Sequence, residues 1–239
     1  MKKNQLNIDK EEINKFNDLA SRWWDEDGDF KPLHAINPLR LDYICRQVPL
    51  NGLKIADIGC GGGILSEAMA KKGGLVTGID MAEKAIAVAK LHQIESQTSV
   101  DYKLMTAEEL VKNEKGSFDI ITCLEMLEHV PDPSNVIQSC ANLLKPGGSV
   151  YFSTINKNLK SFLFAIIGAE HILKLLPVGT HEYSKFIKPS SIESWSRQSL
   201  LELQSSIGIE YNPFNSKYSL THNLDVNYMM HFVKPNEDS

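Results

Sequence analysis

The feature that most constrains this chain is a glycine turn between two apolar runs. Residues 53–63 read Leu-Lys-Ile-Ala-Asp-Ile-Gly-Cys-Gly-Gly-Gly, and the next apolar run ends in an acidic residue, Asp80. The pattern predicts a buried strand, a tight turn, a helix, and a carboxylate at the tip of the following strand. An open α/β sheet uses this arrangement to hold the adenosine half of a cofactor.

The spacing of the glycines narrows the class of cofactor. They fall at Gly59, Gly61 and Gly63, whereas the dinucleotide pattern G-x-G-x-x-G needs its last glycine at position 64, where the chain has Ile64. A dinucleotide places its pyrophosphate at the N-terminus of the following helix. The tighter spacing therefore favours S-adenosylmethionine, which has no pyrophosphate, and disfavours an NAD-dependent oxidoreductase.

Length and composition are those of a single soluble α/β domain. The chain has 239 residues, 42% of them hydrophobic and 23% charged. A formal net charge of −5 gives no indication of binding to nucleic acid. The four cysteines lack C-x-x-C spacing, and the N-terminus lacks the apolar core of a signal peptide. We therefore expect reduced thiols and a cytoplasmic location.

Short apolar runs alternate with helical patterns from residue 53 onward, which predicts a mostly parallel sheet with helices on both faces. Seven strands are expected, at 53–58, 75–79, 99–104, 118–123, 148–154, 205–211 and 226–233, with the last pair closing the sheet as an antiparallel hairpin. Helices are expected at 63–72, 82–95, 134–144 and 190–204, with a turn at 145–148. Residues 51–239 would form this domain.

Residues 1–50 are predicted to form a helical extension that packs on the domain. A helix over 9–24 carries apolar residues at spacings of three and four, with Asp9 and Glu12 as a capping signal. A second helix is expected over 38–48, with Pro38 in its first turn.

An insertion is expected at 156–188, after the fifth strand. Its apolar stretch Phe162–Leu176 is flanked by lysines and is shorter than the roughly 20 apolar residues that span a bilayer. The pattern fits a helix lying in the membrane interface, and a lid helix packed on the protein's own core is the alternative. The first interpretation predicts a peripheral association with the inner face of the membrane.

Residues at the tips of the first two strands are the candidates for binding the cofactor. Asp57 could order the glycine turn or meet the amino group of methionine, unless it is a solvated strand-end carboxylate. Gly59 and Gly61 would let the cofactor approach the backbone closely, where the alternative is an ordinary tight turn. Asp80 could accept two hydrogen bonds from a ribose diol, or cap the next helix.

Adenine contacts are expected at two further places. Met81 follows Asp80 directly, and Thr106 with Ala107 follows the third strand. Capping of the next helix by Thr106, with Glu109 as its partner, is an almost equally good interpretation of that residue.

The fourth strand is followed by a group of titratable residues. Glu125, Glu128 and His129 stand at i, i+3 and i+4, which places them on one face if the segment is helical. They could hold a divalent ion, or Glu128 and His129 could be catalytic, with His129 as a general base. The alternative is a solvated helical turn that ends at Pro131.

A resemblance to a known family rests on these motifs and on others outside them. Residues 57–63, Asp80, the run Glu-Met-Leu-Glu-His-Val-Pro-Asp-Pro at 125–133 and Leu-Lys-Pro-Gly-Gly at 144–148 resemble class I S-adenosylmethionine-dependent methyltransferases with a Rossmann-like fold. Blocks spread over nearly the whole chain are similar to the ubiquinone-biosynthesis O-methyltransferase family. These blocks are 20–25, 30–34, 36–41, 179–181, 185–189, 211–213 and 225–229.

The resemblance implies an enzyme that methylates ring hydroxyls of a polyprenyl catechol and of a demethylubiquinol, within a possible biosynthetic complex. It implies cofactor contacts at Arg40, Gly59, Asp80 and Leu124, the last of which is a methionine in relatives. It also implies Mg²⁺ bound by the face that contains Glu125, Glu128 and His129. Two alternatives stay open: a small-molecule methyltransferase acting on carbon or nitrogen, and a non-catalytic module that binds S-adenosylmethionine.

Overall fold

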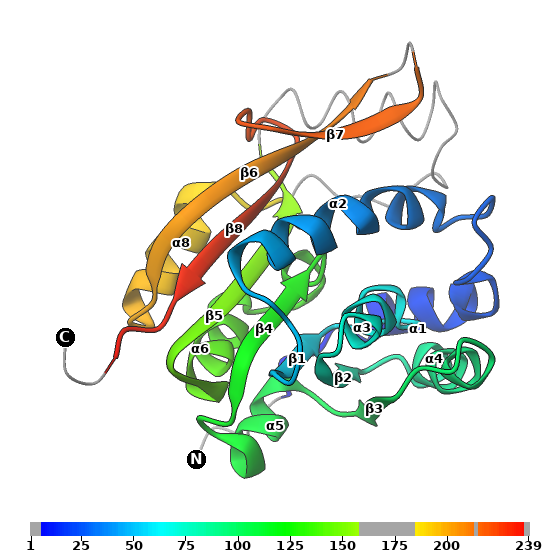
Figure 1. The fold of residues 1–239 in the computed structure, drawn as a ribbon, viewed down its shortest axis with the longest axis horizontal. Helices are drawn as coiled ribbons and strands as arrows, with labels where there is room; N and C mark the ends of the chain where they lie inside the picture. Colours follow the sequence, from blue (N-terminus) through cyan, green and yellow to red (C-terminus); the bar gives the residue numbers. More distant parts are fainter. Residues whose placement is uncertain (1–5, 158–184, 213–214, 237–239) are drawn as a thin grey trace.

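The computed structural model describes residues 6–157, 185–212 and 215–236, which form a sheet covered by helices on both faces (Figure 1). The strand order is β3-β2-β1-β4-β5-β8-β6-β7. Strands β1 to β5 run parallel, β8 is antiparallel to both β5 and β6, and β7 is antiparallel to β6. The strands are β1 (Lys54–Ile58), β2 (Leu75–Asp80), β3 (Val100–Leu104), β4 (Phe118–Leu124), β5 (Leu144–Ile155), β6 (Glu202–Asn212), β7 (Lys217–Thr221) and β8 (Asn227–Val233).

This topology confirms the predicted mostly parallel α/β fold, with one strand more than expected. The additional strand is β7, at the edge of the sheet, where it forms a hairpin with β6. The last two expected strands, β6 and β8, are antiparallel neighbours as predicted, but the prediction that they form a hairpin is wrong because β7 lies between them in the chain. Its sequence Lys-Tyr-Ser-Leu-Thr is short and half polar, so it carries little of the apolar signal that marks a central strand.

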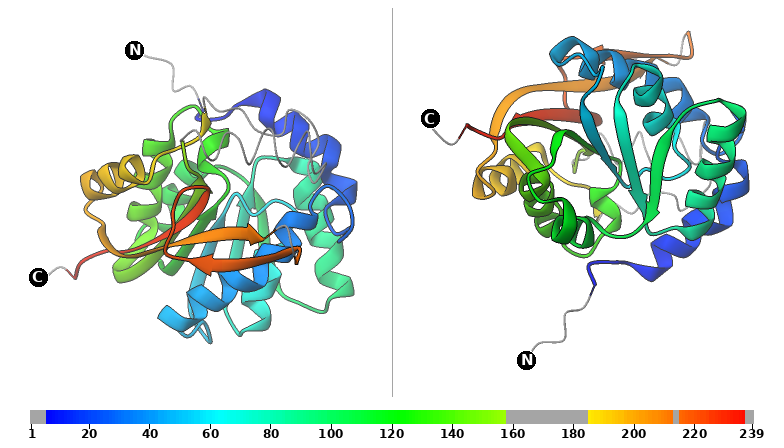
Figure 2. Two further views of the ribbon diagram at one scale, coloured as in Figure 1. Left: turned by 90° about the horizontal axis from the view of Figure 1, so that it is seen from above. Right: turned by 60° about the horizontal axis from the view of Figure 1, so that its bottom comes forward.

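Helices α2, α3 and α4 cover one face of the sheet, and α5, α6 and α8 cover the other (Figures 1 and 2). Adjacent residues of a strand point to opposite faces, so Ile120 belongs to one apolar cluster and Ile121 to the other. The helices are α1 (Lys10–Leu19), α2 (Lys31–Gln47), α3 (Ile64–Lys71), α4 (Glu83–Glu95), α5 (Ala107–Glu114), α6 (Pro133–Leu143) and α8 (Pro189–Gln198).

The N-terminal helices differ in their limits from the prediction. Asp9 caps α1 as expected, since its carboxylate accepts hydrogen bonds from the backbone N–H groups of Glu11 (2.9 Å) and Glu12 (3.3 Å). The predicted start of the second helix at Pro38 is wrong. Helix α2 begins at Lys31, with Pro32 in the first turn, and Pro38 lies inside it. A proline is tolerated in the first turn of a helix because the N–H groups there have no partner within the helix. Pro32 occupies this position, and not Pro38.

The predicted turn at residues 145–148 is a bulge within β5. Phe118 of β4 pairs with Leu144, but Ile120, two positions on, pairs with Ser149. Gly147 takes a left-handed φ of 76° in the extra segment. The strand therefore begins at Leu144, before the glycines rather than after them.

All four cysteines are free, in agreement with the expectation of reduced thiols. None of the helices in the described ranges is both long enough and apolar enough to cross a bilayer. The stretch Phe162–Leu176, on which the membrane interpretation depends, lies outside the described residues.

Candidate active site

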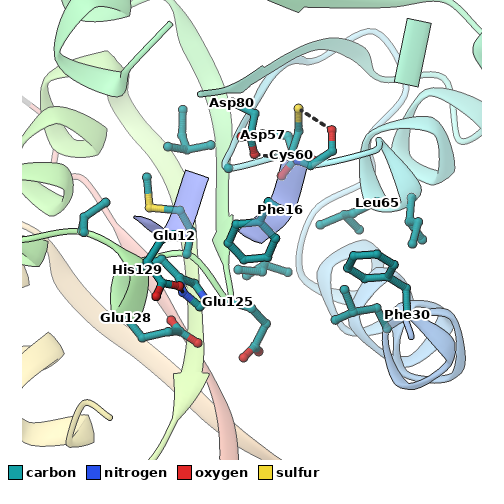
Figure 3. Close-up of a pocket in the computed structure, with 18 of the residues that line it drawn as sticks. Glu12, Phe16, Phe30, Asp57, Cys60, Leu65, Asp80, Glu125, Glu128 and His129 are labelled. Carbon is teal, nitrogen blue, oxygen red and sulfur yellow. Dashed lines mark hydrogen bonds and ion pairs between the residues drawn. The ribbon is translucent and has the colours of Figure 1, made fainter. Parts of the chain in front are cut away.

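A cavity of about 930 Å³ lies at the carboxyl ends of β1, β2 and β4, under the N-terminal helices (Figure 3). This edge of a parallel sheet is where ligands of such folds bind. Every residue predicted to contact the cofactor lines the cavity: Arg40, Asp57, Gly59, Gly61, Asp80, Met81, Thr106, Ala107 and Leu124. The titratable group predicted from the fourth strand lines it as well: Glu125, Glu128 and His129.

Asp57 is buried near the end of β1, just before the glycine turn. Its Oδ2 accepts a hydrogen bond from Ser66 Oγ (2.5 Å) and its Oδ1 accepts one from Thr122 Oγ1 (2.7 Å). Burial raises the pKa of this carboxyl, and the two hydroxyl donors oppose the change. These two hydrogen bonds connect the end of β1 to helix α3, which follows the glycine turn, and to β4.

The glycines of the turn are required because other side chains press on the backbone. Gly59 has φ +75°, and a Cβ there would lie 2.4 Å from Met126 Cγ. Gly61 has φ +53°, and its Cβ would lie 2.1 Å from Cζ2 of Trp23. Trp23 is stacked on Phe30 with ring centroids 4.0 Å apart, so its indole has little room to move. The N-terminal extension therefore packs directly on the cofactor turn.

Asp80 links the glycine turn to the end of β2. Its Oδ2 accepts from the N–H of Gly61 (2.9 Å) and its Oδ1 accepts from the N–H of Ala82 (2.7 Å). Each carboxylate oxygen can accept a further hydrogen bond, so a diol can still be bound at this position. Burial raises the pKa of Asp80, against the effect of the backbone donors.

Thr106 caps helix α5 in a capping box with Glu109, which is the alternative role predicted for it beside an adenine contact. Its Oγ1 accepts from the N–H of Glu109 (3.2 Å), and Glu109 Oε2 accepts from the N–H of Thr106 (3.0 Å). The threonine also lines the cavity, so its capping role fixes the wall at which α5 begins.

Glu125 is the centre of a buried polar cluster beyond the end of β4. It forms an ion pair with Arg40 of α2, and its Oε1 accepts hydrogen bonds from Ser153 Oγ (2.8 Å) and Asn227 Nδ2 (3.0 Å). Burial favours the neutral carboxyl, but the guanidinium and the two donors hold the pKa of Glu125 below its usual value. The pair places a buried guanidinium and its carboxylate counter-charge at one end of the cavity.

Glu128 differs from its neighbour because it forms no ion pair with a described residue. Its side chain is buried, and Oε2 has no hydrogen-bond partner among the described residues. Burial, followed by the charge of Glu125, raises the pKa of Glu128 to about 7. A carboxyl with a pKa near neutrality can both accept and release a proton at physiological pH.

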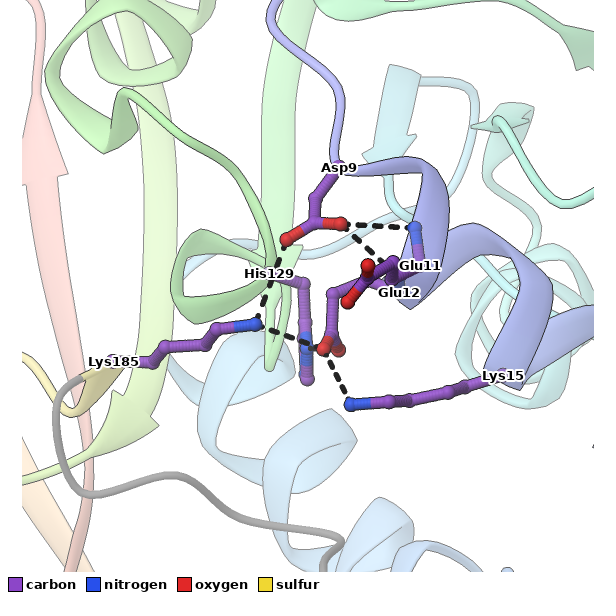
Figure 4. A network of polar contacts seen from close by, with 6 residues as sticks. All are labelled: Asp9, Glu11, Glu12, Lys15, His129 and Lys185. Atoms are coloured by element: carbon purple, nitrogen blue, oxygen red, sulfur yellow. Dashed lines mark hydrogen bonds and ion pairs between the residues drawn. The ribbon is translucent and has the colours of Figure 1, made fainter.

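His129 is held by the N-terminal helix α1 (Figure 4). Its Nδ1 lies 2.7 Å from Glu12 Oε2, and Glu12 Oε1 also binds Lys15 Nζ (2.8 Å) and Lys185 Nζ (2.9 Å). Burial alone would lower the pKa of His129, but the hydrogen bond with Glu12 and the charges of Glu128, Glu12 and Glu125 raise it. The imidazole is thereby fixed in orientation, with Nδ1 engaged.

The structure does not assemble the predicted metal-binding group. Glu125 takes a left-handed φ of 52°, and Glu128 and His129 lie in a 3₁₀ turn, η2 (Leu127–His129), so helical i, i+3, i+4 geometry does not apply. Glu125 is paired with Arg40, and His129 with Glu12. Within the described part of the chain, no group of three or more His, Cys, Asp or Glu residues could hold a metal ion.

Sequence reasoning missed Glu12 and Asn227. The sequence pattern indicates only a capping role for Glu12, whereas in the structure it contacts His129, 117 positions away. Asn227 contacts Glu125 across 102 positions from the start of β8. No local pattern marks either contact. Arg22, for which no role was predicted, pairs with Asp29 at 2.7 Å.

Comparison with known proteins shows the family of the chain. Residues 56–152 match the family model described as a methyltransferase domain. A protein of Hahella chejuensis named "Ubiquinone biosynthesis O-methyltransferase" is 57% identical over 233 residues, which are 98% of each chain. A Pseudomonas aeruginosa protein of the same name is 58% identical, covering 94% of this chain and 97% of its own. The chain belongs to the ubiquinone biosynthesis O-methyltransferase family.

Solved structures share the fold at much lower identity. The magnesium protoporphyrin IX methyltransferase of Synechocystis, solved with bound S-adenosylhomocysteine, aligns with a TM-score of 0.65 at 18% identity, over 93% of this chain and 99% of that one. The same enzyme with bound S-adenosylmethionine gives a TM-score of 0.64. Both agree with a Rossmann-like methyltransferase fold.

Proposed function

We propose that this enzyme transfers the methyl group of S-adenosylmethionine to ring hydroxyls of polyprenylated phenols and demethylubiquinol, at both O-methylation steps of ubiquinone biosynthesis. The observation that carries the proposal is one cavity lined both by the predicted cofactor residues and by a buried carboxyl with a near-neutral pKa. The names of relatives at 57–58% identity support the choice of substrate.

In the proposed complex the cofactor lies along the carboxyl ends of β1 and β2. Asp80 accepts hydrogen bonds from the ribose hydroxyls through its remaining lone pairs. Adenine is surrounded by Met81, Thr106 and Ala107. Leu124 gives an apolar contact at the end of β4. The carboxylate of the methionine part points toward Arg40, because the Nε of this guanidinium has no hydrogen-bond partner among the described residues and can still donate to a carboxylate. The volume of about 930 Å³ is at the upper end of ligand pockets, which leaves space for an acceptor ring.

The acceptor oxygen must lose its proton before it attacks, since an unperturbed phenol has a pKa of about 10. We assign this proton to the unpartnered Oε2 of Glu128, beside the imidazole that Glu12 holds. The phenolate oxygen then forms a bond to the methyl carbon as the carbon–sulfur bond breaks, which leaves a neutral thioether. Alignment in a water-poor site can supply roughly 7–11 kcal/mol of the barrier reduction.

Magnesium would serve by lowering the pKa of the catechol and orienting its two oxygens. The side chains expected to bind it, Glu125, Glu128 and His129, do not fit that role as they are placed, because two of them already have partners in Arg40 and Glu12. We therefore derive no step through the ion. Methyl transfer in excess chelator tests this: retained activity supports direct proton transfer, and activity restored only by added Mg²⁺ contradicts it.

A labelled-methyl assay with a short-chain catechol tests the function itself. We expect Glu128→Gln and His129→Gln to lower kcat by about 10²–10⁴-fold, with the Kd for S-adenosylmethionine little changed. The matched control is Glu108→Gln, another cavity-lining carboxylate that binds Asn7 and Asn135 instead of the acid cluster.

If label is transferred to carbon or nitrogen acceptors but to no phenol, the proposed substrate class is wrong and the enzyme is a C- or N-methyltransferase. Binding of S-adenosylmethionine without transfer to any acceptor would favour the non-catalytic module.

Peripheral contact with the membrane is proposed from sequence alone, because residues 162–176 lie outside the described ranges. A polyprenyl acceptor resides in lipid, and the lysine-flanked apolar stretch suits an anionic interface. Deleting residues 160–176 is expected to abolish co-sedimentation with anionic liposomes and to leave the affinity for S-adenosylmethionine intact. Unchanged co-sedimentation would reject the proposal.

A further inference from the structure

Phe16 of α1 stands inside the cavity between two groups of acidic residues (Figure 3). Asp57 and Asp80 lie on one side of its ring, and Glu125 and Glu128 lie on the other. The side chain comes from the N-terminal extension, not from a strand end where such sites are usually built.

Two ring contacts fix the position of Phe16 between the glycine turn and the catalytic group. Its centroid lies 6.1 Å from that of Trp23, whose indole packs on Gly61, and 5.0 Å from that of His129. The Phe16 and His129 rings meet at 85°, so they are in edge contact and are not stacked. Phe16 is half-buried and lines the cavity, so its ring can contact a ligand there.

The transferred methyl must pass through the same region. In the proposed complex the cofactor lies on the glycine turn and the acceptor oxygen lies near Glu128, so the sulfur and its methyl group lie between them. This sulfur is positively charged in the donor and neutral in the product. The face of a benzene ring is negative and attracts a cation within about 6 Å of its centroid.

We propose that the ring of Phe16 contacts the sulfonium of S-adenosylmethionine, and so makes the cavity bind the methyl donor more tightly than S-adenosylhomocysteine. The inference rests on the proposed binding of the cofactor in this cavity. Loss of the charge during transfer removes the attraction at once, which weakens binding of the product and limits its inhibition. Phe16 is thus a specificity residue of the donor site.

Calorimetric titration of the full chain with each ligand, without an acceptor, tests the inference. Phe16→Leu keeps an apolar side chain but removes the ring, and it is expected to weaken S-adenosylmethionine binding by about 2- to 30-fold. Binding of S-adenosylhomocysteine should change by less than about 2-fold, because the product carries no charge for the ring to attract. Phe16→Tyr retains the aromatic face and should keep the wild-type ratio of the two Kd values.

Leu19→Ala is the matched control, since Leu19 lines the same cavity from the same helix without a ring. It is expected to change both affinities by the same factor. Phe16→Met is the second non-aromatic variant, to be used if Phe16→Leu unfolds.

Equal losses for both ligands in Phe16→Leu would overturn the inference and leave Phe16 as a packing residue. An altered KM for the acceptor with an unchanged donor-to-product ratio would also overturn it, because the ring would then serve the acceptor. Failure of the wild-type chain to bind either ligand would instead refute the proposed cofactor site itself.

Discussion

Replacing Gly61 by alanine separates the two reasons for a glycine at this position. The residue has φ +53°, which a side chain rarely adopts, and its Cβ would lie 2.1 Å from the Trp23 indole. The left-handed backbone alone costs about 1 kcal/mol. Relief of the clash requires Trp23, which is 6% exposed, to leave its site on the turn.

The magnitude of the second effect follows from the burial of Trp23. Complete loss of a buried Trp side chain costs about 3–5 kcal/mol, so its displacement should cost at least about 2 kcal/mol. For a chain of this length each 1 kcal/mol lowers Tm by roughly 2–4 °C. Gly61→Ala should therefore lower Tm by roughly 6–12 °C and weaken binding of S-adenosylmethionine, because the turn and the side chain above it both move.

Gly52→Ala is the matched control for the backbone effect. Gly52 has φ +76°, and nothing lies within 4 Å of the position of its Cβ. It should lower Tm by only roughly 2–4 °C. In a Trp23→Ala background, Gly61→Ala should cost no more than Gly52→Ala does in the wild type. Calorimetry measures all four variants, and equal costs for Gly52→Ala and Gly61→Ala in the wild type would refute the reasoning.

Three further predictions concern the cavity wall. Glu125→Gln removes the ion-pair partner of the buried Arg40 guanidinium and should destabilise by about 3–5 kcal/mol in urea unfolding, whereas the exposed Glu193→Gln should cost under about 1 kcal/mol. Glu128 has a folded pKa near 7, above its usual 4.5, so the stability contributed by its neutral form is full below about pH 4.5 and is lost as the pH rises to about 7; in urea unfolding, Glu128→Gln should therefore gain stability relative to the wild type over this range and gain no more above it. Thr106→Ala removes a capping box at a cost of about 1 kcal/mol, and a Kd for S-adenosylmethionine changed by more than about 2-fold would show that Thr106 also contacts the ligand.

The cofactor-binding part of the cavity was predictable because short sequence patterns mark its residues. A glycine turn after a buried strand, and a carboxylate at the tip of the next strand, fall on the same edge in any parallel sheet. Asp57, Gly59, Gly61 and Asp80 line one cavity for that reason. The family resemblance added Arg40, which no pattern around residue 40 indicates.

The sequence predicted which titratable residues, Glu125, Glu128 and His129, line the cavity, but it did not predict how they are arranged. The spacing of Glu125, Glu128 and His129 suggested one helical face, but the chain leaves β4 through a left-handed residue and a 3₁₀ turn, so their environments differ. Whether a carboxylate there is paired depends on residues far away in sequence, such as Arg40 and Glu12. Such pairings depend on tertiary packing, which periodicity does not encode.

The contact between Glu12 and Lys185 also bears on how the protein is made. The two residues are 173 positions apart, and ribosomes add roughly 5–20 residues per second. Glu12 is therefore synthesised roughly 9–35 seconds before its partner Lys185. The first helix to be synthesised is among the last to gain its full set of native contacts.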